Sequence, residues 1–131
     1  LNKKMNAPSV LQDFHVKYQN KTDLITSLSG GNQQKVVLAR WLSNHPLIVL
    51  ADDPTKGIDV QARRDVHKIM VEIANKGSAV LMVSSDNDEL VNLTSMTENS
   101  RLIVMYEGQI VKTLTGKSIS VENIAKASVN L

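Results

Sequence analysis

The sequence predicts an α/β fold organised around a mostly parallel sheet. Three short aliphatic runs, at residues 47–51, 79–83 and 102–106, have the length and side-chain branching of strands. The segments between them are long enough for helices, and the first of these places apolar residues at helical spacing. Strands that alternate with helices are typical of a parallel sheet covered by helices.

The bulk composition describes one globular domain or a piece of one. The 131 residues are 42% hydrophobic and 21% charged, and only 3% are aromatic, so the core should be aliphatic. The net charge of +2 is small and the basic residues are scattered, which argues against a nucleic-acid partner. The absence of cysteine excludes a disulfide framework and thiol chemistry.

The N-terminal third leads into the first long helix. Residues 9–14 predict at most a short helix, which loop then follows. Residues 31–44 are good or acceptable helix formers, and Ser29 with the two glycines after it supplies an N-terminal signal. Pro46 stops this helix, because the residue before a proline is pushed out of the helical region.

Two continuously apolar runs follow. Residues 47–51 and 79–83 show no polar alternation, which favours strands buried on both faces inside a parallel sheet. Residues 60–75, which lie between these runs, predict a helix that Gly77 closes.

The C-terminal part predicts a hairpin that adds an edge strand to the sheet. Glu107-Gly108 has the character of a tight turn between two strands. The elements expected around it are a short helix at about 88–93, a surface loop at 94–100, strands at 102–106 and 109–114, and a closing helix at 120–127 capped by Ser120.

The first segment with chemical character is the mouth of the first long helix. Ser29, Gly30 and Gly31 would present exposed N–H groups and the positive end of the helix dipole to an anion, and glycine would let a phosphate approach the backbone. Taken alone, these three residues are better explained by a capped helix after a flexible turn, because such tripeptides are common.

The second segment is the end of the run at residues 47–51, where Asp52 and Asp53 follow. In open parallel sheets ligands bind at this end of the strands. One carboxylate could hold Mg²⁺, directly or through water, while the other orients an attacking water. A solvated exit from the strand is the alternative. Asp59, after the next turn, is by default a helix cap.

The order of these segments resembles the ATP-binding subunits of ABC transporters from about Val16 to the end of the chain. The resemblance rests on LSGGNQQK, an amphipathic helix, LIVLADDPTKGID, a second helix and AVLMVSSD. The form LSGGNQQK followed by PTKGIDV is most similar to the second ATP-binding domain of fused subunits that import simple sugars such as ribose, galactose or xylose. Close relatives of those subunits import nucleosides or furanosyl signalling molecules.

The resemblance implies a partial P-loop NTPase domain of the RecA-like, ABC ATPase type. Residues 1–45 would form the rear of the helical subdomain with the signature helix, and residues 46–131 the second half of the catalytic core. ATP and Mg²⁺ are the cofactors it implies. The implied partners are a second nucleotide-binding domain, a membrane permease and, indirectly, a periplasmic or extracellular sugar-binding protein, with the subunit peripheral at the cytoplasmic face of the membrane.

By position, the resemblance also implies residue roles. Ser29, Gly30 and Gly31 match the signature residues that contact the γ-phosphate of ATP held by the opposite domain, and Asn32 stands where many relatives have glutamine. Asp59 matches an aspartate at the interface between the two domains.

The catalytic positions depart from the common pattern. Asp52 matches the aspartate near Mg²⁺, but Asp53 stands where the family usually has a catalytic glutamate. Ser85 stands where many members have a switch histidine, as is familiar in the second domain of sugar importers. Aspartate is one methylene shorter than glutamate, and errors of ~1 Å can cost about a hundredfold in rate, so we expect a weakened general base.

The phosphate-binding loop is the main missing feature. No Gly-rich loop ending in Gly-Lys-Ser/Thr is found, and we expect it upstream of Leu1. The whole subunit would be an ATPase, whereas this chain alone is predicted to be inactive and to bind ATP weakly.

Two rival functions remain open. In one, the domain is a catalytically degenerate module that supplies Ser29, Gly30 and Gly31 to the opposite domain, which Asp53 and Ser85 favour. In the other, the chain belongs to a DNA-repair or chromosome-maintenance ATPase, against which the lack of heptads and of a basic stripe argues.

The remaining conspicuous side chains are assigned structural roles. The three histidines are isolated and share no metal-ligand spacing. Trp41 and Met70 are expected in the core, and a solvated helix face is expected for the charges Arg63, Arg64, Asp65 and Lys68.

Overall fold

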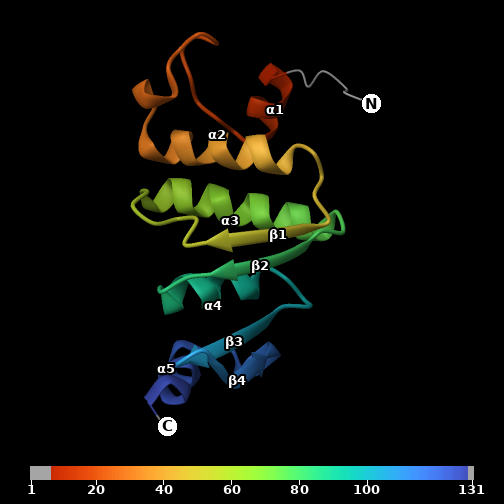
Figure 1. Cartoon of the computed structure of the whole chain (residues 1–131), viewed down its shortest axis with the longest axis vertical. Helices are drawn as coiled ribbons and strands as arrows, with labels where there is room; N and C mark the ends of the chain where they lie inside the picture. Colours follow the sequence, from red (N-terminus) through yellow and green to blue (C-terminus); the bar gives the residue numbers. More distant parts are fainter. Residues whose placement is uncertain (1–6, 130–131) are drawn as a thin grey trace. The chain divides into compact units, whose positions relative to one another are not determined.

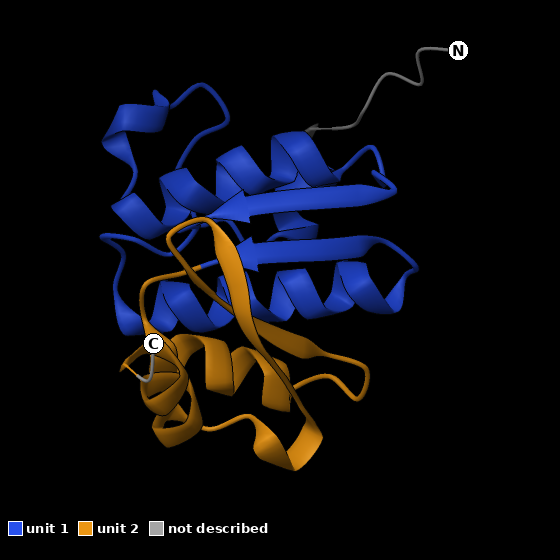
Figure 2. Ribbon diagram, turned by 60° about the horizontal axis from the view of Figure 1, so that its bottom comes forward, with its two compact units in different colours: residues 1–83 blue, residues 84–131 orange. Residues whose placement is uncertain are grey.

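The structure is a computed structural model that describes residues 7–129 (Figure 1). It divides into two compact units, Leu1–Val83 and Ser84–Leu131, which Figure 2 colours separately. Helices and strands alternate along the chain, which confirms the predicted α/β class. The expected division into residues 1–45 and 46–131 concerns subdomains of a larger domain and stays a prediction.

The first unit contains two parallel strands and the helices that pack on them. Its two strands are hydrogen-bonded in register from Ile48↔Ala79 to Asp52↔Val83, and the helix between them provides the crossover that parallel strands require. The elements are α1 (Ala7–Asp13), η1 (Ile25–Ser27), α2 (Gly30–Leu42), β1 (Ile48–Asp52), α3 (Val60–Asn75) and β2 (Ala79–Val83).

The core of this unit is aliphatic, as the composition predicts. It brings together residues of α2, α3 and one face of β1, and Val66 and Met70 on α3 are its most deeply buried members. The helix at 60–75 has the predicted bounds, because Asp59 caps its start and the chain leaves it before Gly77. The buried cluster consists of Leu38, Leu42, Val49, Val66, Ile69 and Met70.

The prediction that both strands are buried on both faces is wrong. Val49 is buried against the helices, but Ile48 is 67% exposed and Leu50 75% exposed. In β2, Leu81 is 55% exposed on the same side as Leu50, its partner in the ladder. The strands are apolar on both sides, but no described element of the first unit covers the second face.

The prediction that Trp41 lies in the core is also wrong. Its side chain is 70% exposed, whereas Met70 is buried as expected. The buried positions of α2 form a stripe at helical spacing, and residue 41 falls beside this stripe rather than on it. The stripe consists of Gly31, Lys35, Leu38, Ala39 and Leu42.

The second unit contains the predicted hairpin and two helices. Glu107 and Gly108 both have positive φ, 45° and 78°, as a tight hairpin turn requires. Ser120 Oγ accepts from Asn123 N at 3.2 Å, so the predicted cap of the last helix is confirmed. The elements are α4 (Asn87–Ser95), β3 (Arg101–Tyr106), β4 (Gln109–Thr115), η2 (Gly116–Ser118) and α5 (Val121–Val129).

The sheets differ from the single, mostly parallel sheet that was expected. In the described part of the chain, β1 and β2 form a parallel pair and β3 and β4 form a separate antiparallel pair. The hairpin is therefore confirmed as a hairpin but not as an edge of the parallel sheet. No helix within residues 7–129 combines the length and hydropathy that a membrane crossing needs.

Candidate functional site

Most predicted site residues lie at one end of the first unit. Figure 1 shows the arrows of β1 and β2 pointing to the end at which α2 and α3 begin. This end carries the start of α2, the exit of β1 and the start of α3. It therefore gathers residues 29–32 with Asp52, Asp53 and Asp59. Ser85 lies in the second unit and is described there.

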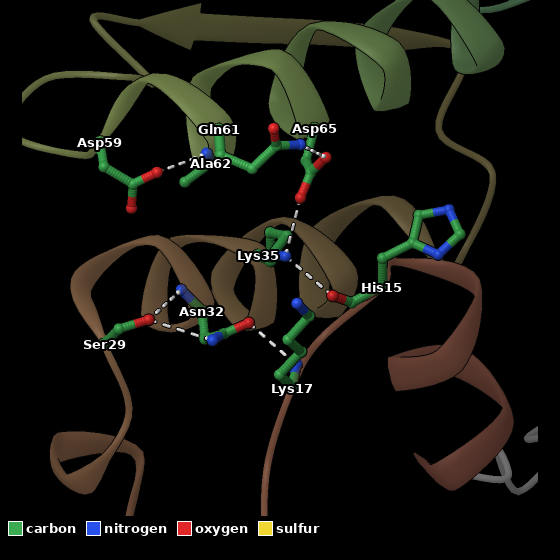
Figure 3. A network of polar contacts seen from close by, with 9 residues as sticks. All are labelled: His15, Lys17, Ser29, Asn32, Lys35, Asp59, Gln61, Ala62 and Asp65. Atoms are coloured by element: carbon green, nitrogen blue, oxygen red, sulfur yellow. Dashed lines mark hydrogen bonds and ion pairs between the residues drawn. The ribbon is translucent and has the colours of Figure 1, made fainter.

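Ser29 caps α2, as expected. Its Oγ accepts from the backbone N of Asn32 at 3.4 Å and from Asn32 Nδ2 at 3.0 Å (Figure 3). Gln33 reinforces the turn, because its Nε2 donates to Leu28 O at 2.8 Å. These contacts leave the Ser29 hydroxyl proton available, since an oxygen that accepts can still donate once.

The two glycines of the helix mouth have different reasons to be glycine. A Cβ built on Gly30 would meet no heavy atom of the described residues within 4 Å, so space lies open in front of it. A Cβ built on Gly31 would lie 2.3 Å from Ala62 Cβ, on α3. Gly31 is therefore required by the close approach of two helices, whereas the open space at Gly30 leaves room for a ligand to reach the backbone.

Asn32 joins the helix mouth to the segment before it. Its Oδ1 accepts from the backbone N of Lys17 at 2.9 Å, while its Nδ2 bonds Ser29. The side chain thus fixes the turn from two sides.

Asp52 and Asp53 leave β1 in different conformations. Asp52 is the last residue of the strand and is exposed. Asp53 has a φ of 41°, in the left-handed region that aspartate tolerates better than most residues. Its backbone N still donates to Val83 O at 2.9 Å, and its carbonyl accepts from Lys56 N at 3.1 Å. The chain therefore turns sharply at Asp53, directly after the last residue of the strand.

Asp59 is the cap of α3 that the sequence suggests. Its Oδ1 accepts from Ala62 N at 2.9 Å. Its Oδ2 lies 3.5 Å from the position that a Cβ on Gly31 would take. The starts of α2 and α3 are thus in contact through Gly31, Asp59 and Ala62.

Ser85 is exposed in the loop that precedes α4, and a polar ring holds this loop. Ser84 Oγ donates to Glu89 Oε2 at 2.5 Å and accepts from Asp86 N at 3.1 Å. Asp86 Oδ1 caps the helix by accepting from Glu89 N at 3.0 Å. Glu89 is only 3% exposed and was not among the predicted site residues. Its signal is a carboxylate three residues after a helix cap, which is a capping-box position.

A buried ion pair beside the site was also missed. Lys35 Nζ lies 3.1 Å from Asp65 Oδ2 and donates to His15 O at 2.8 Å. Asp65 was expected on a solvated helix face, and Arg64 and Lys68 are indeed exposed there. Asp65 itself contacts Lys35, which is only 4% exposed. Burial raises the pKa of Asp65, but the bond and charge of Lys35, helped by Gln61 and Lys68, outweigh it and lower the pKa.

The tripeptide Gly116-Lys117-Ser118 has the residues that end a phosphate-binding loop, although it was not among the predicted sites. A P-loop needs a further glycine five positions earlier, where Val111 stands. The three residues form η2, and Ser118 Oγ closes that turn by accepting from Thr115 N at 2.9 Å and donating to Thr115 O at 2.7 Å. This segment is a turn between β4 and α5.

The carboxylates at the end of β1 suit Mg²⁺, which needs few protein ligands, better than a cation whose ligands all come from the protein. Among the described residues no group of three or more metal-ligating side chains comes together. Mg²⁺ usually takes one or two carboxylates and completes its shell with water and phosphate oxygens. The exposed carboxylate of Asp52, with Asp53 next to it, fits that donor set.

Comparison with known proteins decides the family. Residues 2–56 match a family model described as ABC transporter, and curated relatives of one kind match over most of the chain. The chain belongs to the ABC transporter family. The part that matches the family model includes the mouth of α2 and the exit of β1, so the two segments that carried the resemblance lie within it.

The curated ABC relatives are ribose importers by name. A Ribose import ATP-binding protein RbsA from Shigella dysenteriae serotype 1 is 47% identical over 97 residues, which are 74% of this chain and 19% of that protein. The RbsA of Clostridium perfringens is 37% identical over 134 residues, with 100% of this chain and 26% of that protein covered. The chain therefore spans about a fifth to a quarter of the length of these relatives.

A solved ABC cassette has the same fold. The ATP-binding cassette MJ0796, in a dimeric post-hydrolysis state bound to ADP and Pi, aligns with a TM-score of 0.66 and 27% identity. The alignment covers 83% of this chain and 45% of the cassette. The prediction of a partial P-loop NTPase domain is confirmed at the level of the fold.

Proposed function

We propose that this chain is part of the ATP-hydrolysing subunit that powers the import of a simple sugar, such as ribose, through a membrane permease. The observation that carries the proposal is the shared end of the first unit, where a serine-capped helix mouth and a carboxylate-ended strand lie in an ABC family chain. The names of the curated relatives support the choice of sugar import.

The helix mouth would act on ATP that the opposite nucleotide-binding domain holds. The open space before Gly30 lets a γ-phosphate approach the first N–H groups of α2, where the helix dipole favours negative charge. Ser29 Oγ would add one hydrogen bond, because its proton is not used by the cap. Gly31 and Asn32 would belong to the same phosphate-binding mouth, and their contacts with Ala62 and Lys17 would hold it in place.

The strand exit would serve a second nucleotide, bound in part by this domain. Asp52 would hold Mg²⁺ together with phosphate oxygens and water, and the ion would neutralise charge on the phosphates. Asp53 would orient the attacking water as a general base. The left-handed backbone at Asp53 is an uncommon conformation, and such conformations cluster at functional sites, which supports its use in that role. Asp59 would face the opposite domain.

Ser85 would stand in for a cationic switch residue. A serine donates one hydrogen bond and carries no positive charge, so it would stabilise a γ-phosphate less than a histidine does. The ring of Ser84, Asp86 and Glu89 would hold the loop that carries Ser85.

The proposal includes the surroundings of the chain. The phosphate-binding loop would come from a sequence that precedes this one, so that the chain alone binds ATP weakly. The partners would be a second nucleotide-binding domain and the permease, with a periplasmic or extracellular sugar-binding protein acting indirectly. The subunit would work at the cytoplasmic face of the membrane.

A second candidate is a catalytically degenerate module of a sugar or nucleoside importer. Asp53 and Ser85 favour it, because both replace stronger catalytic groups. In this case the domain would donate its helix mouth to the opposite site without hydrolysing ATP itself.

Hydrolysis by the complete subunit tests and separates these functions. Single-turnover cleavage of ATP would be followed in the complete subunit with its permease, using Ser29→Ala, Asp53→Asn and the remote control Ser95→Ala. Loss of on the order of a hundredfold in rate is expected for Ser29→Ala. A loss for Ser29→Ala without one for Asp53→Asn would select the degenerate module. Full activity of both variants would overturn the proposal.

A further inference from the structure

We propose that Lys35 is a positioning residue, which fixes the register of α2 on α3 and so holds the Ser29 helix mouth in place relative to Asp59. The inference rests on the proposed function for its consequence, but its physical content concerns only the first unit. It assigns to Lys35 and Asp65 the role of fixing how α2 lies along α3.

The contact is a partly buried clamp of three polar contacts among four residues (Figure 3). The Lys35 ammonium lies 3.1 Å from Asp65 Oδ2 and 2.8 Å from the carbonyl of His15. Gln61 Nε2 donates to the other oxygen of Asp65 at 3.2 Å. The side chain of Lys35 is 5% exposed and that of Asp65 20%, so the charge is removed from water and depends on these partners.

Lys35 occupies a position that packing alone would give to an apolar residue. It belongs to the buried stripe of α2, between Gly31 and Leu38. Replacing a buried ion pair by apolar residues is often neutral or stabilising, so a buried pair is weak evidence for stability. Its better-attested use is to select one arrangement among several. A leucine here would allow α2 to slide on α3, whereas an ammonium must keep its acceptors.

Two contacts one helical turn apart define the register. Gly31 lies against Ala62, and four residues later Lys35 bonds Asp65, three residues beyond Ala62. The contact between Gly31 and Ala62 is close, but it involves no hydrogen bond or charge, so it does not select one register by itself. A slip of one turn would move the helices by about 5.4 Å and leave the lysine charge buried without its carboxylate.

The segment before α2 completes the clamp. His15 has a φ of 52°, a left-handed conformation that a non-glycine residue rarely adopts, and its carbonyl meets Lys35. Two residues later, Lys17 N donates to Asn32 Oδ1 at 2.9 Å. The same short segment therefore bonds the middle of α2 and its mouth. The strained backbone at His15 indicates that the surrounding contacts hold it there.

Amide hydrogen exchange in the 131-residue chain tests the clamp without any nucleotide. Lys35→Met would be compared with Lys68→Met, which removes the same charge near the same carboxylate from an exposed site. The reporters are the first-turn amides of the two helices, Gln33 N bonded to Ser29 O and Arg63 N bonded to Asp59 O. The reference is Asp53 N, bonded to Val83 O in the same unit.

We expect Lys35→Met to raise exchange at Gln33 and Arg63 by roughly tenfold or more, with Asp53 little changed and Lys68→Met without effect. Lys35→Arg, which keeps the charge, should restore most of the protection. Equal acceleration at all three amides would show a merely structural role and overturn the proposal, as would no difference from Lys68→Met. If Lys35→Met does not fold, Asp65→Asn, which keeps a hydrogen-bond acceptor for Lys35, is read by the same criteria.

Hydrolysis by the complete subunit supplies the functional readout. Lys35→Met should lower the turnover rate by roughly tenfold to a hundredfold with little change in the KM for ATP, because the opposite domain holds that nucleotide. Unchanged turnover in a variant with selectively faster exchange would overturn the link to catalysis. If the wild-type subunit shows no dependence on Ser29, the proposed function fails, while the exchange result still decides the role of Lys35 in register.

Discussion

The two faces of the β1–β2 pair have the same chemical character but opposite environments. Val49 faces α2 and α3 and is 8% exposed, whereas its neighbours Ile48 and Leu50 are 67% and 75% exposed. A continuous aliphatic run therefore predicts a strand, but it does not show whether one face of that strand or both are buried. The covered face packs against α2 and α3, the two helices that the clamp joins, whereas the bare face has no packing partner among the described residues of the first unit.

Truncation of the core should have the largest effect. Met70→Ala removes a side chain that is 2% exposed, and it should lower the free energy of unfolding by about 2–5 kcal/mol. Leu50→Ala on the bare face should change it by less than about 0.5 kcal/mol. Urea unfolding of both variants measures the difference. Equal losses would mean that the bare face is packed in solution.

Adding a methyl group at the helix mouth should have the next largest effect. Gly31→Ala places a Cβ 2.3 Å from Ala62 Cβ, and the strain should cost about 1–3 kcal/mol. Gly30→Ala, where space is open, should be neutral or stabilise by up to about 1 kcal/mol. Thermal unfolding of the matched pair checks this. A tolerated Gly31→Ala would show that α2 and α3 lie further apart.

The bare face should also promote self-association of the chain. Leu50→Lys places a charge among the exposed residues Ile48, Leu81 and Val83, and should weaken association by about tenfold, or 1.4 kcal/mol. Sedimentation over a concentration series measures it, with the exposed Glu122→Lys as a control remote in sequence. Association that is unchanged by Leu50→Lys would assign it to another surface.

The clamp should give the smallest effect, through pH. Because the pKa of Asp65 is lowered in the folded chain from its ordinary 3.8, its contribution to stability is present above that value and is lost as the pH falls through the lower, folded pKa. Asp65→Asn should flatten the stability profile in this acidic window and leave its shape near neutral pH unchanged. A variant with the same acid slope as the wild type would contradict the lowered pKa.

Local signals predicted the elements well. The bounds of α3 could be read because a cap, apolar spacing and a glycine all occur within the helix and its immediate neighbours. The hairpin could be read from Glu107-Gly108 for the same reason. The start of α2 and the end of β1, which carry the candidate site, were likewise visible in the sequence.

Contacts between distant residues could not be predicted. Lys35 and Asp65 are 30 residues apart, and nothing near either one announces the other. The crowding that requires glycine at position 31 comes from Ala62, on another helix, and no local signal in the sequence announces it. Trp41 could not be placed because its burial depends on which stripe of α2 faces α3.

The central claim is that the mouth of α2 touches a nucleotide held by another domain. Since the chain has no cysteine, Ser29→Cys gives it a single thiol. This variant would be mixed with an ATP analogue that carries an electrophile on its γ-phosphate, with and without the opposite nucleotide-binding domain, and Ser95→Cys would be the control. We predict rapid labelling of Ser29→Cys only when the opposite domain is present. Equal labelling of both thiols, or labelling that does not depend on the opposite domain, would contradict the account.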